Sequence, residues 1–161
     1  MKKLITIALC IMLAVGLLLS CRNGNDPASP TDDGTESSTV ALRPEEWTLI
    51  RPQKASPALT AEINRLKRAW ESATGKTIVL KTDADPEGAH EILIGETSRA
   101  ASKSARDALQ GDRYALAHDG NHIVIVGSCD ALTAEGVRYF AEKYVASAPA
   151  LTLPDGLQYV S

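Results

Sequence analysis

"DRYALAHDGNHIVIVG", residues 112–127, contains two apolar runs separated by residues that favour tight turns. The runs are 114–118 and 123–126, and Asp119-Gly120-Asn121 lies between them. Asp-Gly and Gly-Asn steps favour hairpin loops because Asp, Asn and Gly tolerate the left-handed backbone that such loops need. The segment therefore predicts two antiparallel strands.

The sequence before this hairpin predicts strands separated by helices. Residues 47–50 indicate a short strand, and a helix follows, with Ser56 as its cap, Pro57 in its first position and Gly75 as its stop signal. Its apolar face repeats at helical spacing, at Leu59, Ile63, Leu66 and Trp70. Strands are expected again over 76–81 and 91–95.

A second helix is expected over 98–109, with Thr97 or Ser98 as its cap, and a third follows the hairpin. One face of this closing helix carries Thr133, Gly136, Val137, Phe140, Ala141 and Tyr144. The predicted order is β-α-β-β-α-β-β-α. Helical crossovers favour parallel neighbours and the hairpin an antiparallel pair, so we expect an α+β fold: a single mixed β-sheet with helices mostly on one face.

The amino-terminal residues 1–20 predict an export signal. Lys2 and Lys3 precede an uncharged apolar run, residues 4–19, which would span about 24 Å as a helix and is short for a membrane crossing. The border at Leu18, Ser20 and Cys21 resembles the lipobox of bacterial lipoproteins. The resemblance implies cleavage before Cys21 and its acylation, so that Cys21 tethers the protein to a lipid bilayer, outside the cytoplasm, at the cell membrane or outer membrane. Ordinary signal cleavage, with Cys21 free or structural, is the alternative.

Residues 21–39 are polar and rich in Gly, Pro, Asp and Ser, and they predict a disordered tether. The folded domain is then expected over 40–161. Acidic residues number 20 and basic residues 17, which argues against nucleic acid as a partner. Once Cys10 leaves with the signal and Cys21 is acylated, Cys129 has no partner for a disulfide.

Four segments resemble one known module: TGKTIVLKTD (74–83), EILIGETSRAAS (91–102), the hairpin at 112–127 and GVRYFAEKYV (136–145). This module is the small, non-catalytic amino-terminal α/β domain of β-N-acetylhexosaminidases and α-glucuronidases. In that family the catalytic acid and base lie in a barrel that follows the small domain. The resemblance therefore implies no catalytic residue at the positions of this domain.

Two groups of residues could bind metal, and neither forms a complete site in the sequence. Asp83, Asp85, Glu87 and Gly88 mimic the opening of a calcium loop, but the twelfth position is Ile94 where a bidentate Glu is needed. We expect a solvated acidic turn there.

The histidines are the second group. His118 and His122 would face each other across an Asp119-Gly120-Asn121 loop, or point to opposite faces with a two-residue Asp-Gly loop, and no third ligand lies nearby in the sequence. We expect both to be exposed on the hairpin and His90 to lie in a loop. No metal or cofactor site is predicted.

Cys129 follows a predicted strand and precedes a helix, in the outline of a nucleophile elbow. The sequence identifies no base or oxyanion site for it, so we expect a small packed cysteine beside Asp130 as the helix cap. Among the aromatic side chains, Trp70 and Phe140 are expected in the core. The side chains of Trp47, Tyr114 and Tyr159 are expected to be freer.

These observations predict a membrane-anchored, non-catalytic lipoprotein. Its domain would serve as a glycan-related accessory or a protein-interaction module, with a glycan or an envelope protein as partner. Two alternatives stay open. One is an enzyme, either a thiol-dependent hydrolase using Cys129 or a fragment of a glycosidase, and the other is a purely structural envelope protein.

Overall fold

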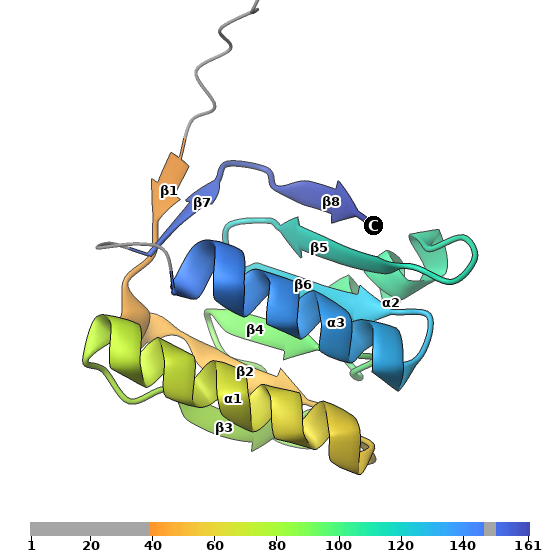
Figure 1. Cartoon of the computed structure of the whole chain (residues 1–161), viewed down its shortest axis with the longest axis horizontal. Helices are drawn as coiled ribbons and strands as arrows, with labels where there is room; N and C mark the ends of the chain where they lie inside the picture. Colours follow the sequence, from red (N-terminus) through yellow and green to blue (C-terminus); the bar gives the residue numbers. More distant parts are fainter. Residues whose placement is uncertain (1–38, 147–150) are drawn as a thin grey trace, which may run out of the picture. The chain divides into compact units, whose positions relative to one another are not determined.

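The computed structural model describes residues 39–146 and 151–161 (Figure 1). The predicted signal peptide, Cys21 and residues 22–38 of the predicted tether lie outside the described residues. Thr39, the last residue of the predicted tether, begins a short strand, β1 (Thr39–Ala41). Within the described ranges, no helix has the length and apolar character that a membrane crossing requires.

The main sheet has six strands in the order β3-β2-β4-β6-β5-β8. They are β2 (Thr48–Arg51), β3 (Val79–Thr82), β4 (Glu91–Ile94), β5 (Tyr114–His118), β6 (His122–Gly127) and β8 (Gln158–Val160). Strands β3, β2, β4 and β6 run parallel, whereas β5 is antiparallel to both β6 and β8. The predicted mixed sheet and hairpin are therefore confirmed.

Short elements that the sequence did not predict complete the described fold. Strand β1 pairs antiparallel with β7 (Thr152–Pro154) in a separate two-stranded sheet, and β8 forms one edge of the main sheet. A 3-10 turn, η1 (Pro44–Glu46), lies between β1 and β2. These elements have three residues each, too few for a hydrophobic period to show in the sequence.

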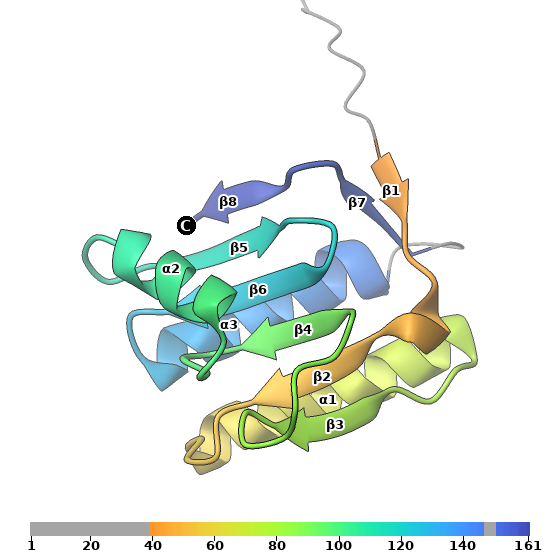
Figure 2. The ribbon, with the colours of Figure 1, turned by 180° about the vertical axis from the view of Figure 1, so that it is seen from behind.

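Two helices lie on one face of the main sheet and one on the other (Figures 1 and 2). Helices α1 (Pro57–Thr74) and α3 (Asp130–Phe140) pack side by side, and the π-helical segment η2 (Ala141–Val145) continues α3. Helix α2 (Ala100–Ala108) lies on the opposite face. The prediction of helices mostly on one face is confirmed.

Helix α1 begins and ends as its sequence predicts. The Ser56 hydroxyl accepts a hydrogen bond from the backbone nitrogen of Leu59 at 3.2 Å, and Pro57 is the first helical residue. Gly75 ends the helix with a φ of +66°, in the left-handed region that glycine adopts without strain. The four predicted apolar positions are all fully buried: Leu59, Ile63, Leu66 and Trp70.

The caps of the other two helices are not the predicted ones. Arg99 precedes α2 as its N-cap, and the Ser98 hydroxyl instead donates to the carbonyl of Asp83 at 2.8 Å. Cys129 is the N-cap of α3, and the Asp130 carboxylate accepts from the backbone nitrogen of Ser56 at 2.7 Å. The predictions of Thr97 or Ser98 and of Asp130 as caps were wrong. Ser98 and Asp130 bond other segments, and the Thr97 hydroxyl accepts from the backbone nitrogen of Arg99 at 3.3 Å, which precedes the helix.

The two faces of the sheet carry cores of different size. The core under α1 and α3 contains large side chains such as Trp70 and Phe140. The hydrophobic core under α2 is small: its buried apolar residues are Ile50, Leu93, Val124 and Val126, and small side chains of α2 pack against them. Since strand residues alternate between faces, each central strand contributes to both cores.

Candidate functional site

A buried ion pair lies on the α2 face, where β4 begins. The Arg99 guanidinium donates from Nε to Oε2 of Glu91 at 2.8 Å and from Nη2 to Oε1 at 3.1 Å. The Glu91 side chain is 1% exposed and the Arg99 side chain 7%. The geometry is the bidentate fork that makes Arg and carboxylate pairs strong.

The same guanidinium also holds the loop between β3 and β4, residues 83–90, which crosses the α2 face of the sheet (Figure 2). Arg99 donates to the carbonyl of Asp85 at 2.9 Å, and the backbone nitrogen of Gly88 donates to Oε1 of Glu91 at 2.8 Å. Burial disfavours the Glu91 anion, but the hydrogen bonds from Arg99 and Gly88 outweigh it and lower the Glu91 pKa below its ordinary value. The pair therefore joins α2, β4 and the loop.

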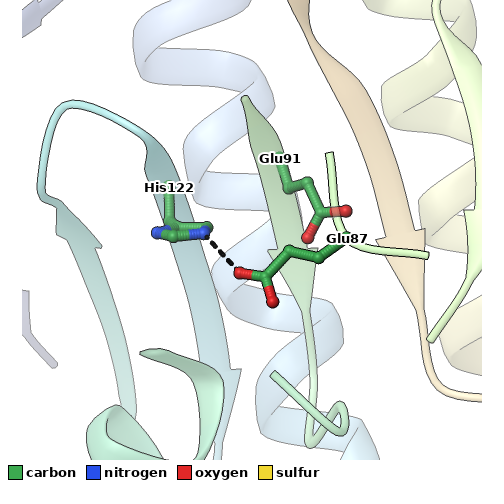
Figure 3. Close-up of side chains that lie close together, drawn as sticks. All are labelled: Glu87, Glu91 and His122. Atoms are coloured by element: carbon green, nitrogen blue, oxygen red, sulfur yellow. Dashed lines mark ion pairs between the residues drawn. The ribbon is translucent and has the colours of Figure 1, made fainter. Parts of the chain in front are cut away.

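Glu87, Glu91 and His122 meet beside this pair (Figure 3). Glu91 and His122 are register partners at the starts of β4 and β6, and Glu87 reaches them from the 83–90 loop. Each of the three offers one ligand atom, and these atoms lie within 4.8 Å of one another. His122 Nε2 is 3.3 Å from Oε1 of Glu87, and its Nδ1 is 3.1 Å from Oδ2 of Asp119.

The hairpin loop explains why His122 reaches this cluster and His118 does not. Asp119 and His122 close a two-residue loop of Gly120 and Asn121, with the Asp119 nitrogen donating to the His122 carbonyl at 3.1 Å. The two histidines therefore point to opposite faces of the sheet, as predicted for a two-residue loop, but the loop residues are Gly120 and Asn121 and not the predicted Asp119 and Gly120.

His118 is buried and His122 is half-buried, so the prediction of exposed hairpin histidines was wrong. The His118 side chain packs on Trp47 with ring centroids 6.2 Å apart, and neither ring nitrogen has a hydrogen-bond partner among the described residues. Burial lowers the His118 pKa below its ordinary value because the charged form loses its hydration. His90, in the loop before β4, lies on the same indole at 5.2 Å.

A groove of about 360 Å³ lies between α2 and strands β5 and β8. Small apolar side chains contribute most of its lining, among them Ala101 and Ala105 from α2 and Ala117 and Val160 from the sheet. His122 and Asp119 also line it. The cluster of Glu87, Glu91 and His122 therefore adjoins a largely apolar groove, an arrangement typical of small-molecule sites.

A second hollow lies at the carboxyl ends of the parallel strands, and it is polar. It is lined by Pro52, Gln53, Lys54, Asp83, Glu96 and Asp130. Asp83, a residue of the rejected calcium loop, uses both its oxygens to accept from the backbone nitrogens of Gln53 and Ser98, at 3.1 and 2.9 Å. Asp85 accepts from the backbone nitrogen of Thr82 at 2.9 Å. Both carboxylates therefore stabilise the surrounding loops by accepting hydrogen bonds from backbone nitrogens.

Cys129 is exposed, so the prediction of a packed cysteine was wrong. The chain has three histidines, and all lie near the amino end of β6 or of its parallel neighbour β4. Cys129 follows the carboxyl end of β6, and the strand from His122 to Gly127 is about 17 Å long. No histidine can therefore serve as a base for the Cys129 thiol in this structure.

The aromatic side chains divide between core and surface differently from the prediction. Trp70 and Phe140 are fully buried, as predicted. Trp47 and Tyr114 were predicted to be freer, and they too are buried. Tyr159 is half-buried and stacks on Tyr139 with ring centroids 4.8 Å apart, so each ring covers a face of the other.

Comparisons with known proteins find a similar fold, at low sequence identity, within larger solved structures. No family model and no curated protein sequence matches the chain. Among solved structures, it is similar to CpGH84D, with 13% identity and a TM-score of 0.54 over 78% of this chain and 21% of that one. It is also similar to BtGH115A, a family GH115 4-O-methyl-α-glucuronidase with specificity for decorated arabinogalactans, with 12% identity and a TM-score of 0.53.

The likeness is one of fold. The match to BtGH115A covers 76% of this chain and 18% of that chain, so this chain matches about a fifth of each of the two larger chains. The predicted resemblance to a small domain of carbohydrate-active enzymes is supported at that level.

Replacing Glu91 by Gln is expected to destabilise the protein by about 3–5 kcal/mol, because the buried Arg99 guanidinium loses its counter-charge. Urea unfolding followed by circular dichroism measures the change. The matched control is Glu96→Gln at an exposed position, expected within about 0.5 kcal/mol of the parent. Equal stability of both variants would contradict a structural role for the pair.

Stability is also expected to fall as the pH drops below about 6.5, the ordinary histidine pKa. In this range the unfolded chain binds a proton at His118, whereas the folded protein, with its lowered His118 pKa, does not. Unfolding free energies measured at steps from pH 7.5 to 5 should show a smaller slope for His118→Phe. An unchanged slope would show that His118 does not contribute.

Proposed function

We propose that this chain is a membrane-anchored lipoprotein whose described domain is a non-catalytic, glycan-related accessory module. The observation that carries the proposal is the fold shared with part of BtGH115A, at a TM-score above 0.5. That protein acts on glycans, and the part of it that is similar to this chain is small. A glycan ligand follows by analogy of fold.

The state of the acidic and nucleophilic side chains supports a non-catalytic role. Both oxygens of Glu91 accept hydrogen bonds from Arg99, which keeps that carboxylate ionised and unsuited to donate a proton. Cys129 has no histidine within reach, which argues against the thiol-dependent hydrolase.

A protein partner in the envelope is the second candidate for the groove beside α2, because its lining is largely apolar and Val160 is 52% exposed there.

Glycan binding is tested with a glycan array followed by calorimetry on the strongest hit. We expect saturable binding of a plant or microbial polysaccharide and no release of sugar from chromogenic glycosides. The Val160→Lys variant, which places a charge in the groove, should weaken that binding if the groove is the site. Absence of any saturable signal would favour the purely structural envelope protein, and turnover of a glycoside would favour the enzyme.

Membrane anchoring is proposed on the sequence before Cys21. In a bacterial host that processes lipoproteins, the full chain is expected to incorporate labelled palmitate and to sediment with membranes. Cys21→Ser should lose the label and enter the soluble fraction, whereas Cys129→Ser should behave as the parent does. Label on Cys21→Ser equal to that of the parent would contradict acylation at this residue.

A further inference from the structure

We propose that Glu87, Glu91 and His122 bind a divalent transition metal, with zinc as the expected ion. The sequence predicted no metal site, because His122 lies 31 residues after Glu91 and only the fold brings it beside Glu87 and Glu91. The inference is independent of the proposed function. It rests on the ligand set, on the spacing of the ligand atoms and on the orientation of the imidazole.

The ligand set suits zinc better than calcium. Zinc binds imidazole nitrogen and carboxylate oxygen, and its catalytic sites commonly combine three such side chains with one open position. Calcium takes six to eight oxygen ligands, and an imidazole is not among those it prefers. Here one histidine and two glutamates converge, and their ligand atoms lie within 4.8 Å of one another.

The spacing of two ligand atoms already fits a tetrahedral ion. Bonds of about 2.0–2.2 Å to zinc place two tetrahedral ligands about 3.3–3.5 Å apart. Nε2 of His122 and Oε1 of Glu87 lie 3.3 Å apart. Figure 3 shows these two atoms facing each other, with the Glu91 carboxylate beside them. A small movement of Glu87, whose side chain is 58% exposed, can complete the geometry.

Asp119 fixes the imidazole in the orientation that a metal needs. Its Oδ2 lies 3.1 Å from Nδ1 of His122, while its Oδ1 accepts from the backbone nitrogens of Asn121 and His122 at 3.0 and 2.7 Å. A proton on Nδ1 donated to this carboxylate leaves the lone pair on Nε2 directed at Glu87. Histidines that bind metal ions nearly always have such a carboxylate or carbonyl partner on the other nitrogen.

The local charge favours a cation. The carboxylates of Glu87, Glu91 and Asp119 surround His122, and Arg99 is the cation that pairs with Glu91. Arg99 keeps Glu91 ionised and holds it in place, so that carboxylate requires no deprotonation to bind metal. With three protein ligands, the fourth position is left for water or for a donor atom of a molecule in the groove, which His122 also lines.

The test is zinc binding by the full chain, purified with a tag that contains no histidine and stripped with a chelator. Competition with a chromophoric chelator measures affinity and stoichiometry, and Co²⁺ absorption reports the ligand geometry. We expect one equivalent of zinc and a tetrahedral Co²⁺ spectrum. Glu87→Gln and His122→Gln should each weaken binding at least about 10-fold, and Asp119→Asn about 10- to 100-fold.

The matched controls are Glu96→Gln and His90→Gln, which leave the three ligands intact and should bind as the parent does. Glu91 is not substituted, because its loss is expected to destabilise the protein by about 3–5 kcal/mol and would confound a binding measurement. Circular dichroism establishes that each variant is folded. The cysteines are unchanged throughout, so metal held by thiols would persist in Glu87→Gln and His122→Gln. Such persistence, absence of stoichiometric binding, or selective binding of Ca²⁺ would overturn the proposal.

Discussion

The described fold depends on one charged contact, the buried bidentate pair of Arg99 and Glu91. Burying two charges is costly unless their remaining donors and acceptors are satisfied. Here the guanidinium also donates to carbonyls of the 83–90 loop, and the carboxylate also accepts from Gly88. The pair therefore fixes the start of α2, the start of β4 and the loop in one arrangement. The core under α2 is small, so polar contacts must hold this face together where apolar packing holds the other.

The register between β4 and β6 places a candidate metal site next to that ion pair. It places His122 beside Glu91, and the 83–90 loop, which Arg99 holds by hydrogen bonds, places Glu87 next to both. The two-residue hairpin loop places His118 on the opposite face, where it is buried and its ring nitrogens have no hydrogen-bond partner among the described residues. Two histidines four residues apart thus acquire different chemistry. One lies among carboxylates at the edge of a groove, and the other has its pKa lowered by the core.

The proposed accessory role and the proposed metal site are compatible because they use different properties of the domain. The first follows from a fold that is similar to a small part of BtGH115A, a 4-O-methyl-α-glucuronidase. The second follows from side chains particular to this chain. A metal ion held by Glu87, Glu91 and His122 would join the loop, β4 and β6, and would therefore stabilise the same face that Arg99 holds. It would also place an electrophilic centre beside the apolar groove.

The sequence by itself determined the hairpin, the limits of α1 and the alternation of helices with strands. These features arise from local causes: a turn that needs Gly, a Ser cap before Pro57, a glycine stop, and apolar side chains at a fixed period. Only the tertiary structure decided which polar side chains cap a helix and which form hydrogen bonds between distant segments. Asp130 bonds Ser56, and Glu91 meets Arg99 and His122, because strand register and helix placement bring distant residues together. The burial of Trp47 and His118 could not be predicted from the sequence either, since it depends on which residues from elsewhere in the chain pack against them.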